Sequence, residues 1–227
     1  MCGRKTLTKN ISSIIDELMI DNWAYPDFRP SYNIAPSQFN AVIIGENNLR
    51  IAKKMRWGFE IDWNSTKSYT PIINARSETI LKKPSFRNLV YSNRCVIISD
   101  GYFEWSKNSK QPHYIYHPEK KLLPMAGLWK IASRIPNETT STYTIITTSA
   151  QKNISKIHHR MPVILKKEYI NEWIFNEDND ICKKIKYSRP YNNSLKSHTV
   201  STLVNSPSYN NPNCIRKDSE QQLSMSF

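Results

Sequence analysis

Cys2 is the residue with the most distinctive chemistry, because loss of the initiator Met1 would make it the N-terminal residue. A small residue at position two permits that loss, which leaves a free α-amine and a thiol on one residue. Their reference pKa values are about 8 and about 8.5, so both nucleophiles are partly available at neutral pH. A 1,2-aminothiol condenses with an aldehyde to an imine and then closes a thiazolidine ring. The alternative is a frayed terminus with an incidental cysteine, and MCGR alone favours that alternative.

Glu104 is the second group that could do chemistry, in the run SDGYFEW over residues 99–105. A carboxyl group between two aromatic residues, on a predicted strand that follows a turn, could be partly desolvated, which would raise its pKa. Such a group suits proton transfer near neutral pH. An outward-facing Glu on an alternating strand is the commoner alternative. The neighbouring Trp105 could stack on a base or lie in the core.

The run His158-His159-Arg160 offers an imidazole and a guanidinium close together. The reference pKa of His158 suits acid and base work, and Arg160 suits a phosphate. One pair of histidines does not form a chelating set, and no nearby Cys or acid completes a zinc site. We therefore predict neither a metal nor a cofactor. Each of these residues could instead be ordinary surface.

The run Asn74-Ala75-Arg76 offers an amide that could orient a nucleophile or a sugar hydroxyl. We expect a short helix to open here and to end before Pro84. The backbone N–H groups at its start would then point at an anion. The alternative is that Asn74 only caps this helix.

The composition indicates a folded protein with a polyanionic partner. The chain has 227 residues, 39% of them hydrophobic, and a net charge of +13. Basic side chains release counterions when they bind phosphates, so this charge favours nucleic acid; biased codon usage is the alternative. Residues 1–10 lack the apolar stretch of a signal peptide, and no apolar run is long enough to span a membrane. We expect a cytoplasmic protein. The cysteines Cys95, Cys182 and Cys214 form no CxxC pair with each other or with Cys2.

The predicted elements do not alternate as parallel βαβ units would. Apolar spacing predicts helices over 10–20 and 166–174 and a hairpin of strands 39–45 and 50–54. Further strands are predicted over 94–99, 101–105, 113–117, 125–131 and 143–148. This order indicates a single-domain α+β fold, with curled antiparallel β-sheets in a barrel-like core and helices at the periphery. From about residue 186 the chain is expected to wrap the surface, and 217–227 to be a disordered tail.

The order of the motifs resembles the SRAP family, the SOS-response-associated, abasic-site-shielding proteins. The resemblance runs from residue 2 to about 216 and rests on a combination of motifs that would not recur in order by chance. These are MCGR (1–4), YNIAPSQ (32–38), RWGF (56–59), INARSET (73–79), RCVIISDGYFEW (94–105), AGLW (126–129), TIITT (144–148), IHHRMPVIL (157–165) and VSTLVN (200–205). One departure is Glu60-Ile61-Asp62, where the family usually carries a proline-containing segment.

The resemblance implies a protein that recognises abasic sites in single-stranded DNA and cross-links to them through the N-terminal cysteine. It implies Cys2 as nucleophile, Glu104 and His158 as a proton-handling pair, and Asn74 as the group that positions the cysteine and the sugar. The implied DNA contacts are Arg4, Arg76 and Arg160 to phosphates, Trp57 and Trp105 as stacking surfaces, and Thr147 or Thr148 as a hydroxyl lining the site. We expect a monomer that associates with the nucleoid when it is bound to DNA, with β-elimination of the strand as a possible side reaction.

Two other functions compete with this expectation. A cysteine peptidase could use Cys2 with His158 as its base, and removal of Met1 could then be autoproteolytic. A module that binds single-stranded DNA without a covalent bond would leave Cys2 incidental.

Overall fold

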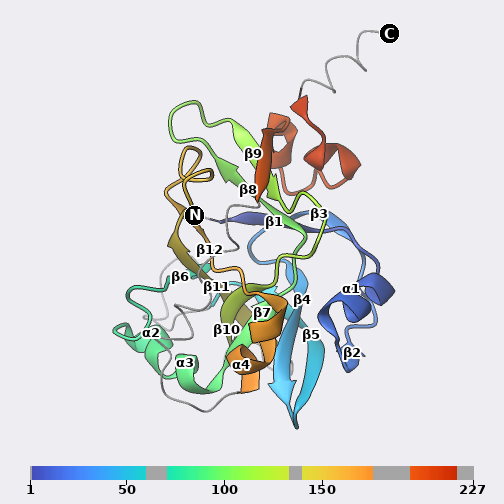
Figure 1. Cartoon of the computed structure of the whole chain (residues 1–227), viewed down its shortest axis with the longest axis vertical. Helices are drawn as coiled ribbons and strands as arrows, with labels where there is room; N and C mark the ends of the chain where they lie inside the picture. Colours follow the sequence, from blue (N-terminus) through green and yellow to red (C-terminus); the bar gives the residue numbers. More distant parts are fainter. Residues whose placement is uncertain (1, 60–70, 133–139, 176–194, 219–227) are drawn as a thin grey trace, which may run out of the picture.

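A computed structural model describes residues 2–59, 71–132, 140–175 and 195–218 (Figure 1). The departure at Glu60-Ile61-Asp62, the cysteine Cys182 and most of the expected tail, residues 219–227, lie outside the described residues.

A closed barrel of five strands forms the core of the molecule. The strands are β4 (Phe39–Glu46), β5 (Leu49–Trp57), β7 (Arg94–Ile97), β10 (Met125–Ile131) and β11 (Ser141–Ser149). Hydrogen-bonded pairing runs β11-β10-β7-β4-β5, and a further pairing of β5 with β11 closes the ring. The predicted barrel-like core is therefore confirmed.

Not every strand pairing in the barrel sheet is antiparallel. The pairing of β5 with β11 that closes the barrel is parallel, as are the pairings of β2 (Asn22–Ala24) with β5 and of β6 (Asn74–Arg76) with β11. The strand β12 (Arg160–Pro162) pairs antiparallel with β11. The barrel is thus mixed, since short strands from distant parts of the chain add to its edges.

A second sheet of five antiparallel strands packs beside the barrel. Its order is β13 (Lys196–Thr199), β9 (Pro112–Tyr116), β8 (Gly101–Trp105), β1 (Arg4–Leu7) and β3 (Ser31–Ile34). Tyr102 and Leu7 belong to the main core, whereas Phe103 and Tyr114 belong to a smaller apolar cluster with Val204. The 3-10 helices η2 (Thr202–Asn205) and η3 (Pro212–Ile215) pack on that side, at the red end of the chain in Figure 1.

A tight turn and a close backbone approach explain local sequence choices in the barrel. The β4–β5 hairpin turns at Asn47 and Asn48, whose φ angles are 51° and 61°. Positive φ at both positions is what a two-residue hairpin turn of type I′ requires, and Asn tolerates it. In β10, a Cβ on Gly127 would lie 2.6 Å from the carbonyl oxygen of Thr144 on β11. Only glycine lets these two strands pack at this point.

The helices that form lie at the periphery, as predicted. Helix α1 (Ile11–Leu18) is capped by Asn10, whose side chain accepts from the backbone N–H of Ser13. The short helices α2 (Pro84–Arg87) and α3 (Leu89–Ser92) precede β7, and η1 (Lys167–Tyr169) continues into α4 (Ile170–Phe175). None of the described helices is long and apolar enough to cross a membrane.

The expected helix at Asn74 is wrong. Residues Asn74–Arg76 form strand β6 instead, because their backbone groups pair with β11 from Ile145 to Thr147. No helix N-terminus points at an anion here. Strand formation still serves the site, because it turns alternate side chains to opposite faces: Ala75 is buried and Arg76 is exposed.

Candidate active site at the seam between the two sheets

Cys2 lies two residues before the start of β1 and is fully buried, between the two sheets. The Nδ2 atom of Asn74, on the barrel sheet, donates a hydrogen bond of 3.0 Å to the backbone oxygen of Cys2. Arg4 pairs with Phe103 of β8, so β1 brings Cys2 close to Glu104. Burial raises the pKa of the Cys2 thiol far above its ordinary value, and the charge of Glu104 acts in the same direction.

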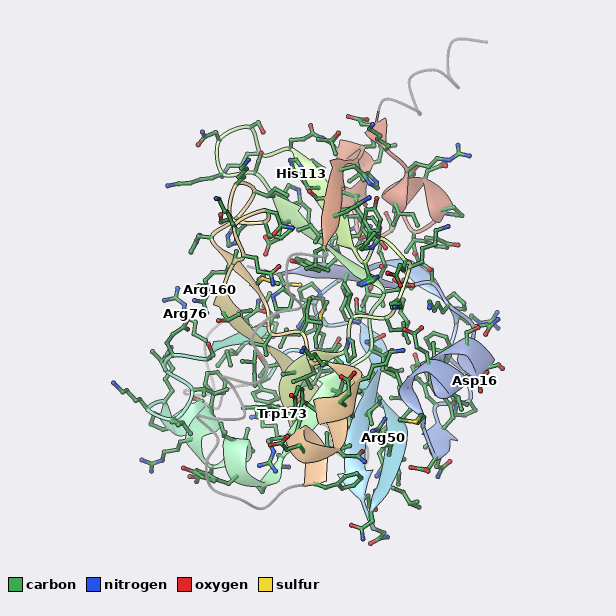
Figure 2. The ribbon with its side chains drawn as sticks, in the orientation of Figure 1. Asp16, Arg50, Arg76, His113, Arg160 and Trp173 are labelled. Carbon is green, nitrogen blue, oxygen red and sulfur yellow. The ribbon has the colours of Figure 1, made fainter. Side chains whose placement is uncertain are left out.

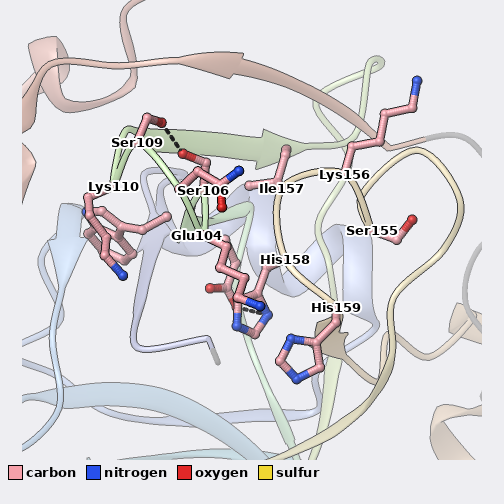
Figure 3. Close-up of a pocket in the computed structure, with 12 residues that line it drawn as sticks. Glu104, Ser106, Ser109, Lys110, Ser155, Lys156, Ile157, His158 and His159 are labelled. Carbon is pink, nitrogen blue, oxygen red and sulfur yellow. Dashed lines mark hydrogen bonds and ion pairs between the residues drawn. The ribbon is translucent and has the colours of Figure 1, made fainter.

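Glu104 does not face the solvent from an alternating strand. Its side chain is only 2% exposed, and burial raises the pKa of its carboxyl group to about 7. Its Oε1 atom lies 3.8 Å from Nδ1 of His158, the ion-pair contact drawn in Figure 3. The desolvated carboxyl group predicted from the two flanking aromatic residues is therefore present, and it faces the imidazole that was expected to share its protons.

His158 reaches this carboxyl group from the segment before β12. Its Nδ1 atom lies 3.0 Å from the backbone nitrogen of Arg160 and 3.2 Å from the carbonyl oxygen of the same residue, so the backbone of Arg160 orients the ring. Burial lowers the pKa of His158. Near pH 7, His158 is thus mainly neutral while Glu104 is about half protonated, and the pair can both give and accept a proton.

Asn74 contributes more than the hydrogen bond to Cys2. Its Oδ1 atom is buried, and no described residue provides a donor for it. A buried acceptor without a partner is costly in a folded protein. Because the same amide already holds Cys2, this oxygen is available to a substrate hydroxyl or to an amine at the site.

Arg76 and Arg160 flank β11 at one edge of the barrel sheet (Figure 2). Arg76 is exposed. Arg160 instead donates from Nη1 and Nη2 to the two carboxylate oxygens of Glu78, at 2.6 and 2.9 Å, and from Nη2 to the carbonyl oxygen of Thr147 at 2.7 Å. Thr147 is buried and Thr148 half-buried. The two arginines thus differ in availability to a phosphate, and nothing in the sequence pattern singled out Glu78.

Arg4 has protein partners rather than an open position. Its guanidinium donates to Oδ1 of Asn33 at 2.8 Å, to the carbonyl oxygen of Val204 at 2.7 Å and to that of Asn205 at 3.1 Å. These bonds fasten the start of β1 to the segment around η2. In this arrangement the Arg4 guanidinium holds the N-terminal segment in place, whereas a phosphate contact was expected of it.

The two tryptophans expected to stack on DNA lie in different environments. Trp57 is fully buried, stacks on Tyr143 and donates from Nε1 to the carbonyl oxygen of Ile73. A ring with no exposed surface does not offer a face to a base, so the structure corrects the expectation for Trp57. Trp105 is partly exposed and lines a groove, with its Nε1 bonded to Oδ1 of Asn205 at 2.8 Å.

An open groove of about 760 Å³ extends from Glu104 and His158 (Figure 3). One wall is the loop between β8 and β9, residues 106–110, and the other is the segment 155–159. Three lysines lie along these walls: Lys107, Lys110 and Lys156. Sequence reasoning missed them, because nothing in the sequence indicates that the two loops face each other.

A metal site was not expected. Among the residues with described positions, no group of three or more His, Cys, Asp or Glu side chains could hold a metal ion.

The chain is similar to known proteins in both sequence and fold. The family model described as SOS response associated peptidase (SRAP) matches residues 1–207. The chain is 37% identical to the abasic site processing protein YoqW of Bacillus subtilis, over 95% of this chain and 99% of that protein. It is 33% identical to the abasic site processing protein HMCES of Gallus gallus, over 83% of this chain and 66% of that protein. A crystal structure of a protein from Bacteroides thetaiotaomicron has a TM-score of 0.79 at 22% identity, over 95% of this chain and 99% of that one.

Proposed function

Because the chain belongs to the SOS response associated peptidase (SRAP) family, we propose that it recognises abasic sites in single-stranded DNA and cross-links to them through Cys2. Relatives that match nearly the whole chain are named abasic site processing proteins. The observation that carries the proposal is the grouping of Cys2, Asn74, Glu104 and His158 at the seam between the sheets. An aldehyde at C1′ of the ring-opened abasic sugar is the electrophile that an N-terminal aminothiol suits.

The covalent reaction begins at the α-amine of Cys2 after Met1 has been removed. The amine adds to the C1′ aldehyde, and the resulting carbinolamine loses one water to give an imine. Loss of water needs an acid at the hydroxyl group, and the carboxyl group of Glu104 is protonated in part near pH 7. His158 exchanges protons with Glu104 across their 3.8 Å contact. The Cys2 thiol then adds to the imine carbon and closes the thiazolidine ring.

Ring closure decides the fate of the DNA strand. An imine at C1′ acidifies the protons at C2′, so β-elimination can break the strand at the 3′ phosphate. Closing the thiazolidine removes the C=N bond and diverts the adduct from that lyase route. We assign the orienting role to Asn74, because its amide already holds the backbone of Cys2 and its Oδ1 is free to accept from the amine or a sugar hydroxyl.

Affinity for the strand comes from cations on both sides of the reactive groups. Arg76 is exposed at the barrel edge, and Lys107, Lys110 and Lys156 line the groove. Phosphate contacts of this kind are independent of base sequence and weaken with salt. We assign contacts with the nucleotides near the lesion to Trp105 and Thr148, because both side chains are partly exposed.

The proposal extends to the state and place of the protein. Every residue of the proposed site comes from one chain, which suits a monomer. We place the functional domain at residues 2–216, with 217–227 outside it, and expect it to act in the cytoplasm on nucleoid DNA. Removal of Met1 by the protein itself is a second candidate activity, supported by the peptidase description of the family and by His158 beside the site.

A denaturing gel tests the proposed function. The protein is incubated with an oligonucleotide that holds one abasic site and with a matched intact strand. A band that survives denaturation is expected with the abasic strand alone. A variant shown by mass spectrometry to keep Met1 should form no adduct, because its free amine is on the wrong residue. Cross-linking by that variant would contradict the thiazolidine route, and salt-sensitive binding without any covalent band would favour a non-covalent module.

A further inference from the structure

Two motifs of the family resemblance have no role in the proposed reaction: YNIAPSQ (32–38) and VSTLVN (200–205). The structure joins them through Asn33 on β3, whose side chain is only 1% exposed. We call residues 204–209 the C-terminal turn. The Nδ2 atom of Asn33 donates to three backbone oxygens of this turn: Val204 at 3.2 Å, Ser206 at 3.0 Å and Tyr209 at 2.7 Å. One buried amide therefore fastens the C-terminal turn to the five-stranded sheet.

Arg4 joins the same turn to the N-terminal strand. Its Nη1 atom donates to Oδ1 of Asn33 and to the oxygen of Val204, and its Nη2 atom donates to the oxygen of Asn205. Both hydrogens of Nη1 are thus used, and Nε is buried with no partner among the described residues. A phosphate could reach only the second hydrogen of Nη2. The arrangement suits an anchor within the protein better than a DNA contact.

Asn205 extends the connection to the wall of the groove. Its Oδ1 atom accepts a hydrogen bond of 2.8 Å from Nε1 of Trp105. Trp105 directly follows Glu104 on β8, and both residues line the groove. The C-terminal turn therefore holds the N-terminal strand through Arg4 and the groove wall through Trp105, on either side of the reactive groups.

The N-terminal residue needs such an anchor for its chemistry. The first residues of a domain are poorly ordered unless they are tied down. Strand β1 begins only at Arg4, so Cys2 lies outside the strand ladder, and its backbone oxygen accepts from Asn74. A displacement of about 1 Å in a reacting group can slow a reaction by roughly 10²-fold. A hold on Arg4, two residues along the chain, limits how far Cys2 can move.

We propose that Arg4 and Asn33 are positioning residues: together with the C-terminal turn they hold Cys2 so that its α-amine stays near Glu104. This inference rests on the proposed function, because it concerns the amine that starts the same reaction. The hold acts on the rate of bond formation. It does not act on the attraction of the strand, because the Arg4 guanidinium is bonded to the protein itself.

Adduct formation at saturating abasic oligonucleotide tests the proposal, with protein that has lost Met1. Arg4→Ala and Asn33→Ala should each lower the rate at saturation by roughly tenfold or more. The double variant should stay within about threefold of the slower single variant, because both changes remove the same hold. The affinity for an intact strand and its salt slope should not change. Weaker binding in Arg4→Ala, with a salt slope reduced by about 0.7, would assign Arg4 to a phosphate and overturn the proposal.

Two further variants separate the hold from charge and from stability. Arg4→Lys keeps the charge but not the planar fork of donors, so it should remain slow at saturation, and a wild-type rate would overturn the proposal. Arg50→Ala is the matched control, because Arg50 donates to Oδ1 of Asn171 at 2.7 Å and to the carbonyl oxygen of Leu18. Figure 2 places Arg50 well away from Arg160. Arg50→Ala should be less stable but keep the wild-type rate at saturation; an equal loss of rate would show that lower stability alone slows the reaction, and the proposal would be wrong.

Thiol labelling tests the hold without DNA. Cys2 is fully buried, so iodoacetamide should modify it slowly in wild type. Arg4→Ala and Asn33→Ala should open this end of the chain and speed labelling of Cys2 by roughly tenfold or more, as read on the N-terminal peptide. Cys95, buried in the barrel, should stay as protected as in wild type. Arg4→Lys, which keeps a long charged side chain, repeats both measurements if the alanine variants fail to fold.

The labelling result separates the hold from the proposed function. Unchanged labelling of Cys2, or equal acceleration at Cys95, would contradict a local hold. Faster labelling of Cys2 alone, in a protein whose wild type gives no adduct with an abasic strand, would leave the hold standing while the proposed DNA function falls.

Discussion

The five-stranded sheet and the edge of the barrel contribute different kinds of group to one site. The five-stranded sheet brings Glu104 and, directly before its strand β1, Cys2; both residues are buried and both have pKa values raised by burial. The barrel edge brings Arg76 to the surface and Arg160 into a bond with Glu78. Titratable groups in a desolvated place suit bond making, whereas exposed cations suit phosphate binding. The contrast predicts that chemistry and affinity can be lost separately.

Loss of the nucleophile should have the largest effect. Cys2→Ala keeps an α-amine but has no thiol, so it should abolish the stable thiazolidine adduct with an abasic strand and leave at most an imine that hydrolyses on denaturation. The affinity for an intact strand should stay within twofold of wild type because no cation is changed. Denaturing gels measure the adduct, and fluorescence anisotropy measures the binding. An unchanged adduct yield in Cys2→Ala would show that Cys2 is not the nucleophile, and the assignment of bond making to the buried groups would be wrong.

Loss of the buried carboxyl group should slow the reaction without weakening binding. General acid–base catalysis contributes about 10² to 10⁴ in rate, so Glu104→Gln should slow adduct formation by roughly 10²-fold. Because burial raises the pKa of Glu104 to about 7, the protonated acid is lost as pH rises through 7. The wild-type rate of imine formation should therefore fall above pH 7, and Glu104→Gln should lack that inflection. An inflection retained in Glu104→Gln would assign it to another group.

The stability of Glu104→Gln provides an independent check on the raised pKa of Glu104. A carboxyl group whose pKa is raised in the folded protein binds more protons there than in the unfolded chain between about pH 4.5 and pH 7. Its contribution to stability is therefore lost as pH rises through that window. Glu104→Gln should unfold less readily than wild type at pH 8, by on the order of 2 kcal/mol, with a smaller difference at pH 4. Denaturant titrations at both pH values measure this.

Neutralising the groove should weaken binding by an intermediate amount. Replacing Lys107, Lys110 and Lys156 together by Gln should reduce the slope of log affinity against log salt by up to about 2, at about 0.7 for each phosphate of single-stranded DNA that is no longer neutralised. The covalent rate at saturating DNA should stay unchanged. The control replaces three lysines away from the groove: Lys9, Lys53 and Lys196. An equal reduction of the slope in that control would mean that the charge of the whole protein, and not the groove, attracts the strand.

A single change at the barrel edge should have a smaller effect. Arg76→Ala should weaken binding to intact and abasic strands alike, by roughly five- to tenfold at low salt, and should lower the salt slope by about 0.7. Anisotropy titrations at several salt concentrations measure both. A loss confined to the covalent rate would reassign Arg76 to the chemical step.

Release of Arg160 from Glu78 should have the smallest effect on DNA affinity, and it should strengthen binding rather than weaken it. Glu78→Gln removes the carboxylate that holds Arg160, so binding to single-stranded DNA should tighten by about two- to threefold, as expected for one additional charge near a phosphate. Glu172→Gln is the control for the change in net charge. Weaker binding in Glu78→Gln would mean that the ion pair positions Arg160 for the strand.

Much of the fold was predictable because local patterns determine it. The helix predicted over 10–20, the hairpin of strands 39–45 and 50–54 and the further apolar strands of the barrel all follow from short-range patterns, and the structure confirms them. The run at Asn74 was wrongly predicted as a helix. Local pattern could not show the strand, because the strand depends on pairing with β11, about seventy residues away. Three-residue strands of this kind are decided by tertiary pairing rather than by propensity.

The site was less predictable wherever burial or a distant partner decides a role. The sequence indicated Cys2, Asn74, Glu104 and His158, and the structure brings them together. The sequence did not indicate that the Trp57 ring is fully buried, because alternation along a strand does not say which face is buried. The bond between Arg160 and Glu78 joins residues 82 positions apart, beyond the reach of any local motif.

The mass of the adduct tests the central claim most directly. Protein that has lost Met1 is incubated with an abasic oligonucleotide, measured intact by mass spectrometry, then digested and mapped. A thiazolidine predicts the mass of protein plus oligonucleotide minus one water, on the peptide that begins with Cys2, and insensitivity to borohydride. No adduct, or an adduct on any other residue, would contradict it.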